Sequence, residues 1–121
     1  MKFLWWLPFG RVPEMDALKL YALLQAGDEP QLIDVRTAME WRDSRISGTV
    51  NAPITELKSR LESLKLNKSR PVIAICRSAH RSIPAVRLLR ARGFEAFQLK
   101  QGMQAWWQEK LPVVSDNDSA N

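Results

Sequence analysis

The most restrictive feature of this sequence is a short apolar run that is followed at once by a polar loop and a helix. The run, Pro-Val-Ile-Ala-Ile at 71–75, shows no alternation of polar and apolar residues. Such a strand is typical of a parallel sheet that helices cover on both faces. After the loop, residues 82–92 form a helical pattern that tolerates Pro84 in its first turn and ends at Gly93. This strand–loop–helix unit limits the chain to α/β architectures.

The rest of the chain alternates strands and helices in the same way. We expect a first helix to begin at Pro13, and Thr55 to cap a later one. The other expected elements are strands at 32–35, within 48–53 and at 94–99, and helices at 37–43 and 103–110. This alternation predicts an α/β fold with a central, mostly parallel β-sheet flanked by helices on both faces.

The length of 121 residues suits one domain, and no linker or internal repeat divides it. We expect an apolar extension at 1–10, the folded domain at 11–114 and a polar, flexible tail at 115–121. One cysteine and one histidine exclude a disulfide within the chain and argue against a zinc site. The low cysteine content fits a reducing compartment and predicts a cytoplasmic protein.

The N-terminal segment, MKFLWWLPFG, is far shorter than the ~20 residues that span a bilayer. It also lacks the cleavage site of a signal peptide. Its aromatic residues at positions 3, 5, 6 and 9 either cover the domain's own surface, the commoner arrangement, or rest weakly on a membrane surface.

The chain carries a net charge of +5, and its positive charges are concentrated. No Asp or Glu occurs between Ser63 and Phe94, whereas eight Lys and Arg residues do. A concentration of positive charge attracts anions. Because no DNA-binding or RNA-binding motif is present, we expect a small anionic substrate rather than nucleic acid.

Cys76 lies directly after the apolar strand, at the edge of the sheet where α/β folds bind ligands. The following helix N-terminus offers free N–H groups and a positive dipole end, which favour the thiolate. Arg77 and Arg81 add positive charge. A lone cysteine at a strand end is often only a small buried hydrophobe, but these polar neighbours favour a nucleophile. His80 is either a substrate contact or a solvated loop residue.

Four ordered motifs resemble those of the rhodanese family of sulfurtransferases. CRSAHRS at 76–82 is similar to the family's active-site loop, Cys-x-x-Gly-x-Arg. The other three are LIDVR at 32–36 with Glu40-Trp41 after it, RISGTVNAPITEL at 45–57, and GFEAFQLKQGMQAWWQEKLPV at 93–113. The resemblance extends over residues 11–114.

The resemblance implies that Cys76 takes a sulfur atom from an anionic donor, such as thiosulfate or a persulfide. Cys76 would hold it as a persulfide and pass it to a nucleophilic acceptor, such as a thiol or a thioredoxin-like protein. It implies no metal and no cofactor beyond this covalent intermediate. Asp34 and Arg36 correspond to the pair that braces the loop, although an ordinary surface ion pair is the alternative. The residues implied to bind donor and persulfide are Arg77, Ser78, Ala79, His80 and Arg81.

Three positions depart from the family pattern. Ala79 replaces the usual loop glycine, which would cost about 1–2 kcal/mol if the position needs a positive φ. Arg45 replaces a histidine and Gln101 a frequent glycine, and we expect these two changes to affect packing or substrate choice.

Two other functions compete with sulfur transfer. A cysteine phosphatase of the dual-specificity type needs five residues between Cys and Arg and a preceding His. Here four residues separate Cys76 from Arg81, and Ile75 precedes the cysteine. A non-catalytic rhodanese-like binding module is the second alternative; Ala79 favours it and the retained cysteine opposes it.

Overall fold

The computed structural model describes residues 4–7 and 9–117, and its centre is a five-stranded sheet. The strand order is β1-β5-β4-β2-β3, and every neighbouring pair is parallel. The predicted parallel α/β sheet is therefore confirmed. The strands are β1 (Glu14–Met15), β2 (Gln31–Asp34), β3 (Val50–Asn51), β4 (Val72–Ile75) and β5 (Ala96–Leu99).

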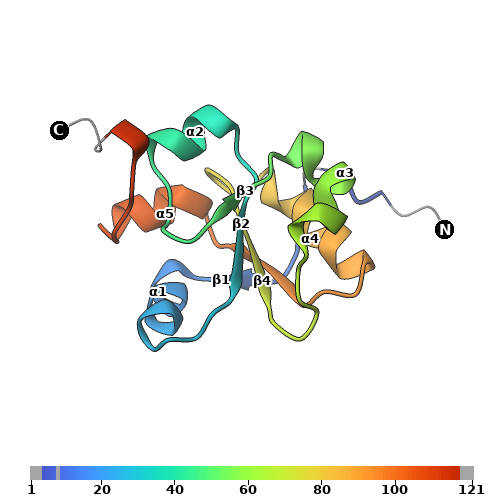
Figure 1. Ribbon diagram of the computed structural model, residues 1–121, viewed down its shortest axis with the longest axis horizontal. Coiled ribbons are helices and arrows are strands. Elements are labelled where there is room, and N and C mark those ends of the chain that lie inside the picture. Colours follow the sequence, from blue (N-terminus) through green and yellow to red (C-terminus); the bar gives the residue numbers. More distant parts are fainter. Residues whose placement is uncertain (1–3, 8, 118–121) are drawn as a thin grey trace.

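Helices cover both faces of this sheet (Figure 1). One side carries α1, α2 and α5, and the other carries α3 and α4, as the contacts of α1 with α5 and of α3 with α4 also indicate. The helices are α1 (Ala17–Gln25), α2 (Ala38–Asp43), α3 (Ile54–Leu64), α4 (Ser82–Ala91) and α5 (Gly102–Gln108).

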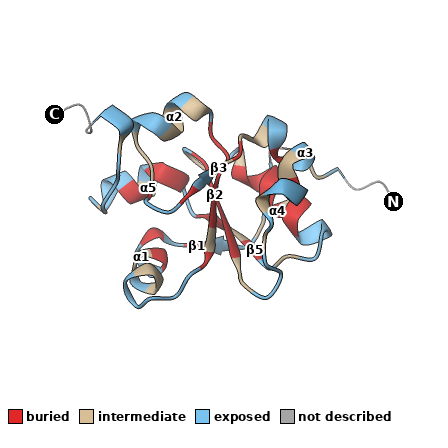
Figure 2. Cartoon of the chain, in the orientation of Figure 1, coloured by how far each residue is buried: buried red, intermediate tan, exposed pale blue. Residues whose placement is uncertain are grey.

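Strand β4 divides two hydrophobic cores. Val72 and Ala74 pack with α3 and α4, whereas Ile73 and Ile75 pack with residues of α1 and α5. All four strand residues are completely buried, and Figure 2 shows the strands at the centre of the sheet as largely buried. This two-sided burial explains why the run at 71–75 contains no polar residue.

Two predicted helix starts are wrong. The first helix begins at Ala17, because Asp16 caps it by accepting a hydrogen bond from the Lys19 N–H at 2.8 Å. The residues before Asp16 form strand β1 instead, which pairs with β5. Helix α3 begins at Ile54, so Thr55 lies inside its first turn and does not cap it.

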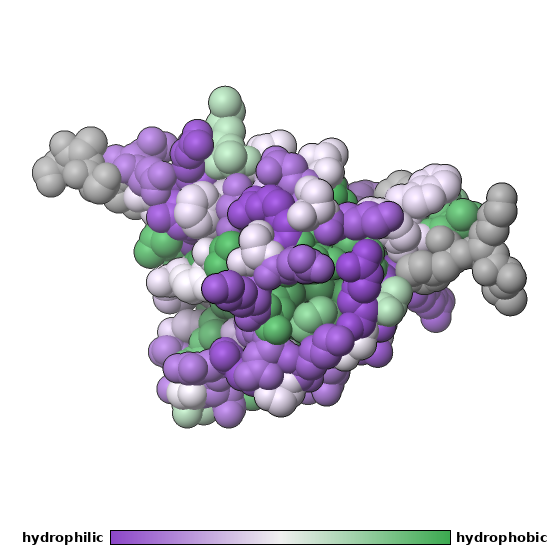
Figure 3. Space-filling model, turned by 45° about the vertical axis from the view of Figure 1, so that its right-hand side comes forward, coloured by the Kyte–Doolittle hydropathy of each residue, from purple (hydrophilic) through white to green (hydrophobic). Residues whose placement is uncertain are grey.

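The N-terminal segment is attached to α4 through its backbone. Arg87 donates to the carbonyl oxygens of Leu7 at 2.8 Å and Phe9 at 2.6 Å. Trp5 packs against the hydrophobic core, as expected for a segment that covers its own domain, but Trp6 and Phe9 are 57% and 64% exposed. Position 3 lies outside the described residues. Figure 3 shows apolar side chains beside this end of the chain, and a further apolar area at the centre of the same face.

The last residues that the structure describes pack beside the end of α2 and the residues that follow it. Arg45 forms a bridge with Val114, lies over the Trp41 ring at 4.2 Å and pairs with Asp116 at 2.8 Å. This replacement for the family's histidine therefore has a packing role. Within the described residues, no helix is long and apolar enough to cross a membrane.

Candidate active site

The candidate site is the loop of residues 76–81, which joins β4 to α4 at the carboxyl edge of the sheet. Cys76 is only 1% exposed, and its Sγ accepts a hydrogen bond from the Arg81 backbone N–H at 3.2 Å. A sulfur atom that accepts backbone hydrogen bonds is stabilised as the thiolate. The predicted position of Cys76 at the strand end and before the helix is confirmed.

The pKa of the Cys76 thiol is lower than its ordinary value of 9.0. Burial raises this pKa, but the backbone N–H groups of Ser78, Arg81 and Ala79 and the positive charge of Arg81 together outweigh that effect. The loop therefore favours the negatively charged form of the sulfur through groups that converge on one atom.

We expect the rate of Cys76 alkylation by iodoacetamide to rise with pH to a plateau, with its midpoint below 9.0. A lowered pKa means that the reactive thiolate persists at pH values where a free cysteine is protonated. Arg81→Gln keeps the backbone N–H but loses the positive charge, so the pH midpoint of its alkylation rate should be higher than that of the wild type. A midpoint at 9.0 or above in the wild type would contradict this account of the loop.

The Arg81 side chain forms a two-point ion pair with Glu40 of α2. Its two terminal nitrogens lie 2.6 and 2.9 Å from the carboxylate oxygens. The hydrogen bond from Arg81 is the main reason that the pKa of Glu40 falls from 4.5 to about 2, and the same bond raises the pKa of Arg81. Arg81 is therefore already paired, rather than free to attract a donor as the sequence suggested.

Glu40 is the site residue that sequence reasoning missed, apart from its place in a family motif. It completes a capping box with Thr37, whose side chain accepts from the Glu40 N–H. The pattern Thr-x-x-Glu could have predicted that cap. No local pattern indicates a partner 41 residues away.

The other loop side chains face outward. Arg77 and His80 are exposed, and Ser78 Oγ lies 3.4 Å from His80 Nδ1. No hydrogen bond or ion pair of the Arg77 side chain occurs among the described residues. Of the two arginines, Arg77 is the one available to meet an anion at the surface.

Ala79 has a φ of 99°, so this position does require the conformation that glycine adopts readily. The loop contacts Ser82, whose Oγ lies 3.1 Å from the Ala79 carbonyl oxygen and 2.6 Å from Gln98 Oε1. Its single proton is shared between these two acceptors. Gln98 in turn donates to Glu14 at 2.8 Å. A polar chain thus runs from the exposed Glu14 of β1 through the buried Gln98 of β5 to the loop and holds it in its strained shape.

Ala79→Gly should stabilise the protein by up to about 1.6 kcal/mol. Glycine relieves about 1–2 kcal/mol of strain, and the greater freedom of the unfolded chain offsets about 0.4–1 kcal/mol of this gain. Urea unfolding of both proteins measures the difference. Ala26→Gly at the end of α1, where φ is −77°, is the matched control and should destabilise.

The first turn of α5 holds the backbone of the Cys76 loop by two hydrogen bonds. The N–H of Met103 donates to the Cys76 carbonyl at 2.8 Å, and the N–H of Gln104 donates to the Arg77 carbonyl at 3.0 Å. Gly102 permits this approach, because a Cβ there would lie 2.2 Å from the Cys76 carbonyl oxygen. The backbone of the nucleophile loop is thereby fixed to α5.

Asp34 and Arg36 form a buried ion pair, not the surface pair that was the alternative. Their side chains are 0% and 2% exposed, with Arg36 Nη2 2.7 Å from Asp34 Oδ2. Arg36 also donates to the Ser44 carbonyl at 2.6 Å. The pair joins the end of β2 to the end of α2, the helix that carries Glu40.

Among residues 4–7 and 9–117, no group of three or more His, Cys, Asp or Glu side chains is arranged to hold a metal ion.

The site is thus a cysteine loop between a parallel strand and a helix, with backbone N–H groups directed at the sulfur. The model of the rhodanese-like domain matches residues 16–109. The chain belongs to the rhodanese-like domain family.

Three relatives illustrate this membership. The putative sulfurtransferase YtwF of Bacillus subtilis is 30% identical, over 84% of this chain and 96% of that protein. The HTH-type transcriptional regulator Rv0324 of Mycobacterium tuberculosis is 37% identical over 81% of this chain, which spans only 44% of that regulator. The solution structure of a rhodanese-like domain from Anabaena is 31% identical and has a TM-score of 0.79, covering 92% of this chain and 85% of that one.

Proposed function

We propose that this protein is a rhodanese-type sulfurtransferase that carries sulfur as a persulfide on Cys76. The observation that carries the proposal is the convergence of loop N–H groups on the Cys76 sulfur, including the 3.2 Å contact from Arg81. Such a loop favours a thiolate in the resting state and a charged persulfide after transfer. The relative named as a putative sulfurtransferase, which this chain matches over nearly its whole length, supports the same activity.

Sulfur transfer then proceeds in two displacements. The Cys76 thiolate attacks the outer sulfur of thiosulfate and forms a new S–S bond. The S–S bond of thiosulfate breaks, and sulfite leaves with the electron pair. An acceptor such as cyanide next attacks the outer sulfur of the persulfide, so thiocyanate leaves and the Cys76 thiolate is regenerated.

The thiolate and the persulfide are stabilised by the same groups of the loop. The backbone N–H groups hold the negative charge in both states, so little reorganisation is required between them. Glu40 keeps Arg81 in position, while Arg77 meets the anionic donor at the surface. Asp34 and Arg36 hold the end of α2 and thus act as positioning residues for Glu40.

Thiocyanate formation from thiosulfate and cyanide tests the proposal. Because Cys76 is the only cysteine, prior alkylation with iodoacetamide gives a specifically blocked control. The untreated protein should form thiocyanate and the alkylated protein should not. Failure of the untreated protein with thiosulfate and with a more reactive persulfide donor would favour a non-catalytic binding module.

A further inference from the structure

The N-terminal segment exposes apolar side chains that the rest of the described protein leaves uncovered. Leu4, Trp6 and Phe9 are 43%, 57% and 64% exposed. The indole N–H of Trp6 takes part in none of the described hydrogen bonds. Figure 3 shows apolar side chains gathered beside this end of the chain. Apolar groups that gather at one place on a surface mark a site of interaction.

The backbone of this segment is fixed to the domain. Arg87 of α4 donates to the carbonyl oxygens of Leu7 and Phe9 at 2.8 and 2.6 Å. The Trp5 ring packs against the hydrophobic core, whereas the neighbouring Trp6 faces solvent. The exposed side chains are therefore presented by a segment that is already ordered, so little conformational entropy opposes their binding to a partner.

Positive charge surrounds these apolar side chains. Arg11 follows them in the chain and is exposed, and the Lys58 ammonium of α3 lies 6.0 Å from the centroid of the Trp5 ring. Neither these two cations nor Arg87 forms an ion pair with a described residue. Helix α3 holds two Glu against one Lys and one Arg, and α4 holds two Arg and no acidic residue. The balance of charge on these two helices is positive, which favours an anionic partner.

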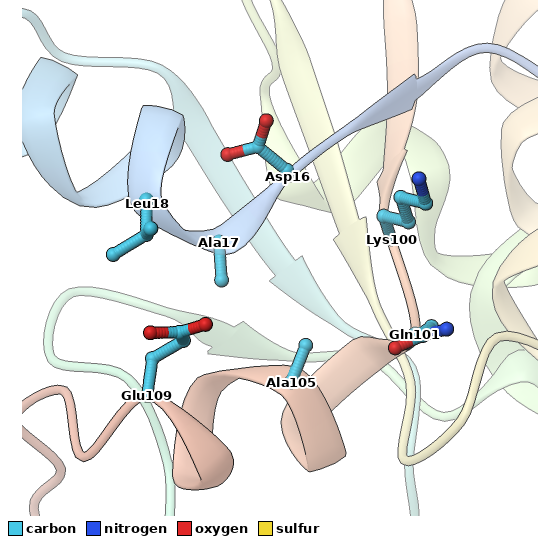
Figure 4. A pocket seen from close by; sticks show the side chains of 7 residues that line it. All are labelled: Asp16, Ala17, Leu18, Lys100, Gln101, Ala105 and Glu109. Atoms are coloured by element: carbon cyan, nitrogen blue, oxygen red, sulfur yellow. The ribbon is translucent and has the colours of Figure 1, made fainter.

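The other side of the sheet is less suited to an anionic partner. A cleft of about 210 Å³ lies there between α1 and α5, and its lining includes the carboxylates of Asp16 and Glu109 with one ammonium, Lys100 (Figure 4). Leu18 of α1 is 55% exposed at this cleft, so an exposed apolar side chain occurs here without a surrounding excess of positive charge. An anionic surface is therefore expected on the side of α3 and α4.

We propose that the N-terminal face, formed by Leu4, Trp6, Phe9, Arg11 and Lys58, binds the surface of an anionic lipid bilayer. Tryptophan and phenylalanine beside lysine and arginine are the side chains that bind at the boundary between headgroups and acyl chains. The apolar side chains enter this boundary, with the free Trp6 indole N–H at the polar level. The cations contact lipid phosphates. This inference is independent of the function proposed for Cys76.

Sedimentation of the whole chain with lipid vesicles tests the apolar part of this face. Vesicles of phosphatidylglycerol and phosphatidylcholine in equal amounts should bind the wild type, and vesicles of phosphatidylcholine alone should bind it much more weakly. Trp6→Ser should raise the apparent Kd for the anionic vesicles about tenfold, because a large apolar side chain is lost from the contact. Leu18→Ser is the matched control and should bind like the wild type.

A second pair of variants tests the charge. Arg11→Gln should raise the apparent Kd for the anionic vesicles about fivefold. Arg42→Gln removes the same charge from an exposed position of α2, on the other side of the sheet, and should leave the Kd unchanged. Urea unfolding of all four variants verifies that each is folded under the conditions of the vesicle experiment.

A wild type that does not sediment with the anionic vesicles would overturn the proposal. Equal losses in Trp6→Ser and Leu18→Ser, or in Arg11→Gln and Arg42→Gln, would also overturn it, because adsorption would then not depend on this face. Sedimentation velocity without vesicles examines the other occupant, a second copy of the chain. A dimer that Trp6→Ser abolishes, in place of vesicle binding, would assign the N-terminal face to self-association instead.

Discussion

Cys76→Ser is expected to lose sulfur transfer completely while the fold is retained. The exchange replaces one sulfur by oxygen, and a hydroxyl at this place can still accept the Arg81 N–H that contacts Sγ at 3.2 Å. A serine hydroxyl, however, is not ionised near neutral pH and forms no persulfide. No other cysteine in the chain can replace it.

Thiocyanate production and urea unfolding should be measured on the same preparations of Cys76→Ser and wild type. We expect the rate of the variant to equal the rate without protein, with a free energy of unfolding close to that of the wild type. A variant that retains a substantial part of the activity would remove Cys76 from the mechanism.

Gly102→Ala should have the largest effect of any substitution outside the nucleophile. Its Cβ would lie 2.2 Å from the Cys76 carbonyl oxygen and 2.7 Å from the Arg77 carbonyl carbon. These are backbone atoms, so no side chain can rotate away. Either α5 moves off the loop, losing the bonds from Met103 and Gln104, or the loop itself shifts.

We expect Gly102→Ala to lower the free energy of unfolding by about 3 kcal/mol, the upper part of the range for overpacking. Sulfur transfer should fall sharply even at temperatures where the variant is folded, because the ring of N–H groups around Cys76 is displaced. Gly48→Ala is a suitable control, since φ is positive there too, 84°, but no atom lies within 4 Å of the added Cβ. Equal losses in both variants would show that backbone strain, and not the contact with the loop, is responsible.

The sequence predicted the parts of the fold that depend on local pattern. The apolar run at 71–75 identified β4 because burial on both faces removes every polar residue from a strand. Leu57 and Leu61, at helical spacing, are both buried in α3. Strand β1, by contrast, has two residues, too few for a periodic signal, and exists because β5 offers it an edge.

The candidate site was predictable only in part, because a local sequence pattern does not indicate contacts between distant parts of the chain. Cys76 could be placed from the strand–loop–helix order, and the positive φ of Ala79 from the family's glycine. The partner of Arg81 could not, since Glu40 reaches it only after the chain has folded. Gly102 is likewise a tertiary requirement, because α5 approaches the Cys76 loop across 26 residues of sequence.

The proposed sulfurtransferase function requires that Cys76 carries sulfur. The decisive measurement is the intact mass of the protein after incubation with thiosulfate, compared with Cys76→Ser and followed by addition of cyanide. We expect a gain of one sulfur atom on the wild type, no gain on the variant, and loss of that sulfur as thiocyanate when cyanide is added. An unchanged mass, both with thiosulfate and with a more reactive persulfide donor, would contradict it.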